Sequence, residues 1–221
     1  MPSAIRIDTF VDPQFGENGY VIWTRTGGSC WFIDPGFSPS GANMAAHARR
    51  ENLTPQAIVL THGHLDHIAG IPQIQQAFPD LAIIMAKEAA PALTDPNQNL
   101  SADYGFPIAL PPQKTQDLPA GSTLSLDGTT WQVFDTSGHA PGSRSLYNAE
   151  AGIVIVGDAL FYRSIGRTDF HNCDGPLFVR NIKHNLLTLP DDTKVYSGHG
   201  PVTTIGAERR YNPYVGMEAE E

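Results

Sequence analysis

The sequence predicts an α/β fold in which two strand-rich blocks, each carrying helices, pack together as a sandwich. Short apolar runs bounded by Gly, Pro and Asp are typical of strands, and they fall into two groups along the chain. Helical segments occur in both groups, and a polar stretch, Thr94–Pro119, separates them. With 221 residues and 41% hydrophobic content, the chain can bury a full core, so we expect residues 1–221 to form a single domain.

The first block contains five predicted strands and three predicted helices. Each strand is a short apolar run that ends at turn-forming residues, as at the Asp-Pro-Gly of residues 34–36. The predicted strands are Ile5–Phe10, Tyr20–Thr24, Cys30–Ile33, Ala57–Leu60 and Leu81–Met85, and the predicted helices are Ser40–Asn52, His67–Phe78 and Lys87–Leu93.

The stretch Thr94–Pro119 is rich in Pro, Asn, Gln and Asp and has little periodicity, which predicts a long surface connection. Loops of this length are more often functional than idle, so we expect part of it to border the active site. The second block follows. Its predicted strands are Thr123–Leu126, Thr130–Phe134, Ser145–Tyr147, Gly152–Val156 and Lys194–Tyr196, and its predicted helices are Leu177–Thr188 and Ile205–Arg210.

Composition excludes several classes of function. A net charge of -9 with only 14 Lys and Arg does not suit binding to a nucleic-acid backbone. The N-terminal segment MPSAIRIDTF has no pattern of a secretory leader, and no window approaches the roughly 20 apolar residues of a membrane span. We therefore expect a cytoplasmic protein that acts away from membranes, with Cys30 and Cys173 reduced.

The segment THGHLDH at residues 61–67 carries the strongest functional signal. His62, His64, Asp66 and His67 follow directly after the apolar run Ala57–Leu60, at the carboxyl end of a predicted strand. Four potential ligands within six residues can converge on a small volume only in a loop. Packing gives no reason for such a cluster, so the segment predicts a metal site.

Three more candidate ligands each follow a strand in a Gly-flanked turn: His139 in TSGHAPGS, Asp158 in VIVGDAL and His199 in YSGHGP. The carboxyl ends of strands can gather a shared site from such single residues. Five His and two Asp are too many for one tetrahedral catalytic metal, but they suit two adjacent ions that share a carboxylate and a water.

This pattern resembles the metallo-β-lactamase fold superfamily, whose signature is HxHxDH followed by separated His, Asp and His. The resemblance extends from the IDPG turn at 33–36 to GHGP at 198–201 and implies a four-layer αββα sandwich. The classical β-lactamase branch commonly has Cys where this chain has Asp158, which argues against antibiotic hydrolysis as the native task. The resemblance implies that one metal is bound by His62, His64 and His139, a second by Asp66, His67 and His199, and that Asp158 bridges them.

Two segments, GDALFYRSIGRTDF at 157–170 and SGHGPVTTIGAERRYNPY at 197–214, are similar to the glyoxalase II group. The similarity is closest to short, single-domain glyoxalase II-like hydrolases, because the chain ends soon after His199, without the helical region that contacts glutathione in full-length enzymes. It implies hydrolysis of a small-molecule thioester such as S-lactoylglutathione by a metal-bridging hydroxide. Asp66 would be a catalytic residue that orients this hydroxide.

Zinc is the expected metal, and a mixed His and Asp site also accommodates iron or manganese. Four residues are candidates for supporting or substrate-facing roles. Asp34 either orients a ligand histidine or only forms a turn. Arg167 and Asp169 are expected to form a buried pair that supports the loop after Asp158, with substrate contact as the second possibility, and Tyr162 is a candidate for the pocket wall.

Three further functions are compatible with parts of the pattern. A persulfide dioxygenase of the same superfamily would bind one iron through His62, His139 and Asp158. Such enzymes typically have an Asp-Tyr pair after the last histidine, where this chain has Gly200 and Pro201, and this favours the hydrolase. A lactonase and a non-catalytic metal-binding protein also fit parts of the pattern, and the sequence leaves monomer and homo-oligomer open.

Overall fold

The computed structural model describes residues 5–217, which form two six-stranded sheets packed face to face. The first sheet has the order β1-β2-β3-β4-β5-β6, antiparallel from β1 to β3 and parallel from β3 to β6. Its strands are Arg6–Val11, Asn18–Trp23, Ser29–Ile33, Thr54–Val59, Ile83–Met85 and Thr115–Asp117, in the order β1 to β6.

The second sheet has the order β12-β11-β10-β9-β8-β7. Strands β8 and β10 both run antiparallel to β9, and β11 runs parallel to β10, so the carboxyl ends of β8, β10 and β11 lie at one edge. The strands are Thr123–Leu126, Thr129–Asp135, Arg144–Asn148, Ile153–Gly157, Lys194–Ser197 and Thr203–Thr204, in the order β7 to β12.

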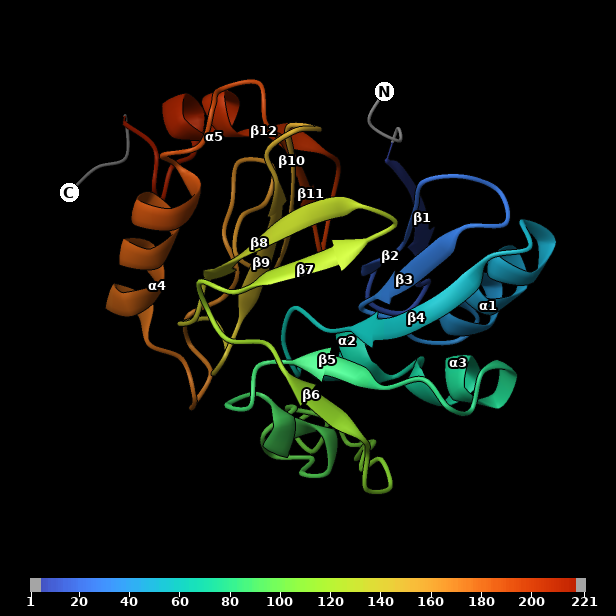
Figure 1. The fold of residues 1–221 in the computed structure, drawn as a ribbon. Helices are drawn as coiled ribbons and strands as arrows, with labels where there is room; N and C mark the ends of the chain where they lie inside the picture. The colour runs from blue at the N-terminus through green and yellow to red at the C-terminus, as the bar shows by residue number, and fades with distance from the viewer. Residues whose placement is uncertain (1–4, 218–221) are drawn as a thin grey trace.

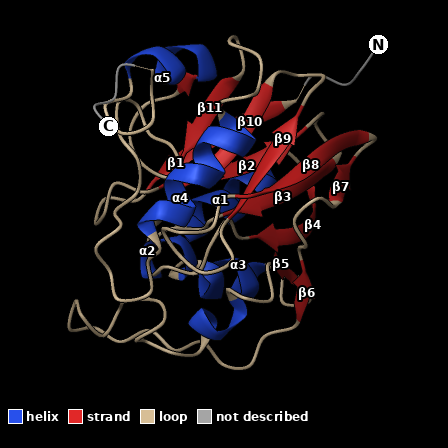
Figure 2. Ribbon diagram, turned by 90° about the vertical axis from the view of Figure 1, so that its left-hand side faces the viewer, coloured by secondary structure: helices blue, strands red, loops and turns tan. Residues whose placement is uncertain are grey.

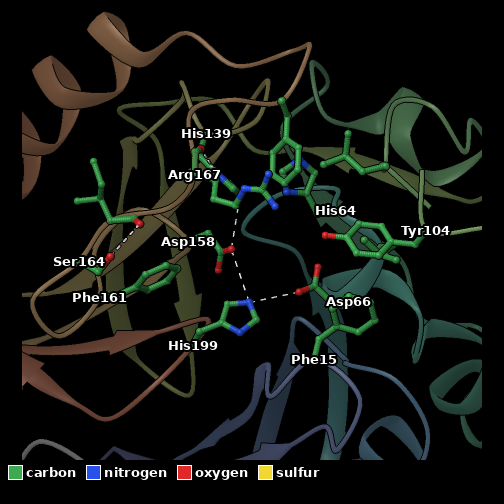
Figure 3. A pocket seen from close by; sticks show the side chains of 14 residues that line it. Phe15, His64, Asp66, Tyr104, His139, Asp158, Phe161, Ser164, Arg167 and His199 are labelled. Carbon is green, nitrogen blue, oxygen red and sulfur yellow. Dashed lines mark hydrogen bonds and ion pairs between the residues drawn. The ribbon is translucent and has the colours of Figure 1, made fainter. Parts of the chain in front are cut away.

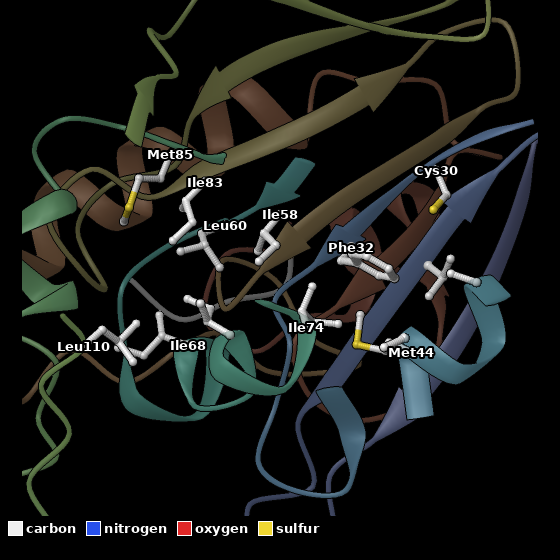
Figure 4. Close-up of a cluster of buried hydrophobic side chains, with 14 of the residues drawn as sticks. Cys30, Phe32, Met44, Ile58, Leu60, Ile68, Ile74, Ile83, Met85 and Leu110 are labelled. Atoms are coloured by element: carbon white, nitrogen blue, oxygen red, sulfur yellow. The ribbon is translucent and has the colours of Figure 1, made fainter. Parts of the chain in front are cut away.

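Helices cover both outer faces, which gives the four-layer αββα arrangement that the resemblance implied (Figure 1). The first sheet is covered by α1 (Ser40–Arg50) and α3 (Ile71–Ala77), whose Met44 and Ile74 are completely buried against Phe32 and Ile58 (Figure 4). Figure 2 faces the opposite side, where α4 (Gly175–Asn181), its π-helical continuation η2 (Ile182–Leu186) and α5 (Ile205–Tyr211) cover the second sheet.

The space between the sheets is filled by side chains that alternate along the strands. In β8, Trp131 and Val133 are buried between the sheets while Thr130 and Gln132 are exposed. Trp131 packs edge-on against Trp31 of β3, with ring centroids 6.1 Å apart. The central strands β2 and β10 are buried along their whole length, because each lies between a helical layer and the opposite sheet.

Three local features differ from the sequence-based expectation. The helix predicted over His67–Phe78 is two helices, α2 (Leu65–Ile68) and α3, because Gly70 packs directly on the 35–36 turn and Pro72 begins a new helix. The polar stretch Thr94–Pro119 includes the edge strand β6, whose residues Thr-Gln-Asp are all exposed and have no apolar alternation. A 3₁₀ turn, η1 (Ala90–Leu93), replaces the short helix predicted at Lys87–Leu93.

Between residues 5 and 217, no helix combines the length and apolarity that crossing a membrane requires. Both cysteines are free, and Cys30 is buried in β3.

Candidate metal centre

The segment THGHLDH follows β4 and continues into the single turn of α2, which contains Asp66 and His67, at the edge of the first sheet where parallel strands end. Its ligand-type side chains point into the protein rather than into solvent. His62 and His67 are 1% and 0% exposed, and His64 and Asp66 are also buried. Burial of four polar side chains in one short segment is costly unless each has a polar or charged partner. A partner that all four side chains could contact would remove this cost.

The second sheet supplies the rest of the site from the carboxyl ends of three strands. His139 follows β8, Asp158 follows β10 and His199 follows β11. Because these strands run in the same direction, their ends meet the THGHLDH loop across the junction of the sheets. Backbone hydrogen bonds fix this junction: the Arg144 N–H donates to the Thr61 carbonyl at 2.8 Å, and the Asn18 N–H donates to the Gly198 carbonyl at 2.7 Å.

Asp158 occupies the centre of the cluster (Figure 3). Its Oδ1 lies 3.3 Å from His67 Nε2, while its Oδ2 lies 3.5 Å from His139 Nε2 and 3.6 Å from His199 Nε2. His199 Nε2 is also 3.2 Å from Asp66 Oδ2. One carboxylate therefore faces histidines of both groups that the sequence pattern assigned to two metals.

The donor atoms fit two metal ions. The ligand atoms of His62, His64 and His139 lie within 4.8 Å of one another, and the same holds for Asp66, His67 and His199. Four buried atoms of these side chains have no hydrogen-bond partner within residues 5–217: His64 Nε2, His67 Nε2, His139 Nε2 and Asp158 Oδ1. Buried polar atoms are rarely left unpaired, and two bound cations, one in each donor group, would satisfy all four.

The second nitrogen of several histidines is held by a protein group, which leaves Nε2 directed at the centre. His139 Nδ1 donates to the Arg167 carbonyl at 2.7 Å, and His67 Nδ1 lies 3.0 Å from Asp34 Oδ2. Asp34 also accepts hydrogen bonds from the Thr61 N–H and hydroxyl, at 2.8 and 2.6 Å. Such contacts fix the tautomer and orientation of ligand histidines, and this is where the structure places Asp34.

Burial and neighbouring charges set the protonation of the cluster. Complete burial, aided by the nearby His139, lowers the pKa of His64 to about 3, and burial likewise lowers the pKa of His62 well below its usual value. Burial alone would raise the pKa of the Asp158 carboxyl, but His67 and its other histidine neighbours hold it well below the usual range. Neutral imidazoles beside an ionised carboxylate are the forms that bind metal.

A cavity of about 370 Å³ opens from Asp66, Asp158 and His199 toward solvent (Figure 3). Its wall is mostly apolar, and it includes Leu100 and Tyr104 of the Thr94–Pro119 stretch, which therefore borders the site as expected. The apolar part of the wall comprises Phe15, Leu65, Leu100, Tyr104, Phe161, Ile165 and Phe170.

Three of the candidate supporting residues lie differently from expectation. Arg167 and Asp169 do pair, with both nitrogen–oxygen distances at 2.8 Å, but the pair is exposed rather than buried. Arg167 lines the cavity and stacks on Phe170, 4.3 Å from its ring centroid. Tyr162 is 52% exposed, stacks with Arg163 and is not part of the cavity wall, because the chain turns outward after Phe161.

The structure also reveals three residues of the β1–β2 region that the sequence did not single out. Glu17 is completely buried, with Oε1 3.9 Å from His67 Nδ1, and burial raises its pKa well above the usual value. Asn18 Nδ2 donates to the carbonyls of Ser197 and Gly200, and the Tyr20 hydroxyl donates to Ser197 at 2.6 Å. Asn18 and Tyr20 hold the turn that carries His199, and the only sequence signal of this region is the Glu-Asn pair where β2 begins.

Comparison with known proteins agrees with this geometry. The family model of the metallo-β-lactamase superfamily matches residues 12–199. The chain belongs to this superfamily. A hydroxyacylglutathione hydrolase, GloC of Haemophilus influenzae, is 31% identical over 207 residues, which cover 93% of this chain and 95% of that protein.

Two solved metallo-β-lactamase-fold structures superpose over nearly the whole chain. The B3 metallo-β-lactamase BLEG-1 is 34% identical with a TM-score of 0.88, covering 95% of this chain and 99% of its own. TTHA1623 in a di-iron-bound form is 34% identical with a TM-score of 0.79, covering 93% and 98% of the two chains. The sandwich fold and the membership of a family of metallohydrolases are thereby established for this chain.

Proposed function

We propose that this protein is a binuclear metal-dependent thioesterase whose first substrate to test is S-lactoylglutathione. The central observation is the position of Asp158, whose two oxygens face histidines of both donor groups. His62, His64 and His139 would hold one ion, Asp66, His67 and His199 the other, and Asp158 would be shared. Similarity to the hydroxyacylglutathione hydrolase of Haemophilus influenzae supports the choice of substrate.

Two divalent cations in such a site supply an acidified water and an electrophile for the substrate carbonyl. The protein's own part is positioning. Asp66 borders the cavity beside His199, and the charges of His67 and His199 overcome its burial and lower its pKa, so it is ionised at neutral pH. Asp66 can therefore accept a hydrogen bond from the attacking water and orient it.

The leaving group needs little assistance. A thiol has a pKa of about 8.5 and departs as thiolate without an obligatory general acid. Among the described cavity residues, none is a lysine, so a leaving group that depends on protonation by a lysine side chain has no donor. This chemistry favours a thioester over an amide as the substrate.

Removal of a central ligand tests the site directly. We expect Asp158→Ala and His64→Ala to lose most bound metal and at least about 100-fold in kcat/KM, beyond the 10- to 100-fold typical of changes to residues that only support ligands. Elemental analysis measures metal content, and circular dichroism checks the fold. His184→Ala, an exposed histidine on η2, is the matched control and retains both.

Elemental analysis of the wild-type protein distinguishes the hydrolase from the dioxygenase. About two ions per chain, with zinc first and iron or manganese as further candidates, support the hydrolase, whereas a single iron would favour the persulfide dioxygenase. Full turnover in Asp158→Ala would overturn the proposed site. The cytoplasmic location stays a prediction.

Similarity to BLEG-1 favours one second candidate, β-lactam hydrolysis. The same cavity and donor set could present a lactam carbonyl, so a chromogenic cephalosporin belongs in the first assays, together with a lactone. We expect the thioester to give the highest kcat/KM, since a thiolate leaves more readily than an amine. A higher kcat/KM for the cephalosporin than for the thioester would contradict the proposed thioesterase function and indicate a β-lactamase.

A further inference from the structure

An aromatic wall built from three separate loops borders the cavity. Phe15 comes from the β1–β2 turn, Phe37 follows β3, and Tyr104 and Phe106 come from the stretch after η1. Phe15 stacks on Phe37 with centroids 5.2 Å apart and meets Tyr104 edge-on at 5.4 Å. Phe106 meets Phe37 at 5.9 Å. We call these four residues the aromatic wall.

Two members of the aromatic wall face the cavity beside the proposed reaction centre. Phe15 and Tyr104 both line the cavity on the side of Asp66, as Figure 3 shows. Tyr104 is 43% exposed, so a large part of its ring is not packed in the protein interior and is available to a ligand. Exposed aromatic surface in a concave site is typical of a binding surface for apolar groups.

The aromatic wall is held in place by buried polar side chains. The Asp12 carboxylate accepts hydrogen bonds from the backbone of Gln14, Phe15 and Glu17, at 2.7, 3.0 and 3.2 Å, and fixes the turn that carries Phe15.

The loop of Tyr104 is anchored in the same way. Asn99 Nδ2 donates to the carbonyls of Ala92 and Ile108, and the Asn99 carbonyl accepts from the Leu65 N–H of the metal loop at 3.0 Å. Both aromatic rings are therefore positioned before any ligand binds, which lowers the entropy cost of binding.

The cavity offers little to a negatively charged substrate away from the metal centre. Apart from the histidines of the metal centre, Arg167 is the only described lining residue with a basic side chain, and Asp169 already binds that guanidinium through two hydrogen bonds. The net charge of -9 adds a long-range repulsion of anions. A carboxylate on the acyl group of a substrate would lose hydration there without gaining a free partner.

We propose that the cavity selects thioesters whose acyl group is uncharged and apolar, and that Phe15 and Tyr104 are the specificity-determining residues that contact this acyl group. This inference rests on the proposed thioesterase function and narrows its substrate class. The reaction adds water across the thioester: the acyl carbon gains the hydroxyl, the carbon–sulfur bond breaks, and the products are a carboxylic acid and a thiol.

A series of thioesters of one neutral thiol, N-acetylcysteamine, tests the proposal on the metal-loaded protein. Each methylene added between acetyl and hexanoyl should raise kcat/KM about threefold to fourfold until the cavity is filled. The succinyl thioester, which places a carboxylate against the wall, should be at least about tenfold slower than butanoyl. Equal rates along the series, or a preference for succinyl, would overturn the inference and leave the thioesterase standing.

Variants locate the preference on the aromatic wall. Tyr104→Ala should lower the hexanoyl-to-acetyl ratio of kcat/KM about tenfold, and Tyr104→Phe, which keeps the ring, should restore it. Tyr214→Ala removes a tyrosine that is also exposed but lies outside the cavity, and it should keep the wild-type ratio. A ratio in Tyr104→Ala equal to that of wild type would reject Tyr104 as a specificity residue.

A binding measurement separates this inference from the proposed reaction. Calorimetry with non-hydrolysable S-ethyl to S-hexyl thioethers of N-acetylcysteamine should show Kd falling threefold to fourfold per methylene, with a negative heat-capacity change. A Kd that falls with chain length, without hydrolysis of any thioester, would support the acyl-binding role of the aromatic wall and reject the proposed thioesterase function. A Kd that does not change with chain length would reject the aromatic wall as the acyl-binding surface, whether or not any thioester is hydrolysed.

Discussion

Gly198 lies where two candidate ligands approach the backbone most closely. A Cβ at this position would lie 2.2 Å from Asp158 Oδ1 and 2.7 Å from His67 Cε1. Atoms cannot approach so closely, and neither neighbour can move without leaving the cluster. Glycine at 198 is therefore required by the packing of the site itself, in the turn that also presents His199.

We expect Gly198→Ala to weaken the site without removing a ligand. Displacement of Asp158 and His67 should lower metal content and reduce kcat/KM about 10- to 100-fold, the range seen when residues that orient ligands are changed. Metal titration followed by assay measures both effects. Gly175→Ala in α4, where a Cβ meets only Thr168 at an ordinary 3.4 Å, should behave as wild type. Normal metal affinity in Gly198→Ala would contradict the packing argument.

The turn of the β7–β8 hairpin, in the second sheet, contacts the β2–β3 region of the first sheet. Its turn residues Asp127 and Gly128 both have positive φ, 46° and 81°, as a tight two-residue hairpin turn requires. Asp127 Oδ2 accepts hydrogen bonds from the Ser29 N–H at 2.8 Å and the Thr24 hydroxyl at 3.0 Å, both in the first sheet's β2–β3 region. One side chain therefore shapes the turn and ties it to the other sheet.

Asp127→Asn keeps a residue that tolerates positive φ but removes the charge. Burial would raise the pKa of Asp127, but the hydrogen bonds from Ser29 and Thr24 outweigh it and hold the pKa below its usual value. A lowered folded-state pKa contributes stability above the unfolded pKa of about 3.9, and this contribution is lost as the pH falls through the folded value.

Because solvent screens this partly exposed carboxylate, we expect Asp127→Asn to lower the free energy of unfolding by only roughly 0.5 kcal/mol at pH 7, and by progressively less below about pH 4. Urea unfolding of both proteins at a series of pH values measures the difference, and effects common to both cancel. A difference that increases toward acidic pH would contradict the assigned sign.

At the scale of the whole molecule, the candidate metal centre lies across the junction of the two sheets. His62, His64, Asp66 and His67 follow the first sheet's β4, whereas His139, Asp158 and His199 follow strands of the second sheet. An ion held by both groups would link the two halves of the sandwich and would bind only the folded chain. Metal binding should thus contribute to stability as well as to chemistry.

We expect removal of metal with a chelator to lower Tm by about 5–10 °C. A ligand at 100 times its Kd stabilises the folded state by about 2.7 kcal/mol, and 1 kcal/mol corresponds to about 2–4 °C for a chain of this size. Scanning calorimetry before chelation, after chelation and after reloading with zinc measures the shift. Identical Tm values in all three samples would show that no ion joins the two halves.

The strands and the seven candidate ligands were accessible from the sequence because their signals are local. A strand is marked by an apolar run and its turn residues, and each ligand directly follows such a run, as His62 follows Leu60. Strand β6 was missed because its three residues are exposed and polar, so an edge strand there leaves no hydrophobic pattern.

By itself, the sequence determined the α/β class with two strand-rich blocks and the residue types gathered at the carboxyl ends of the strands, and the resemblance to a known superfamily implied the four-layer arrangement. Only the tertiary structure decided which groups support them: the Arg167 carbonyl on His139, Asp34 on His67, and Asn18 on the His199 turn. It also brought Phe15 and Tyr104, 89 positions apart (104 − 15), into one wall. Contacts between distant segments and through backbone atoms depend on how the sheets pack, and no local pattern of residue types records that packing.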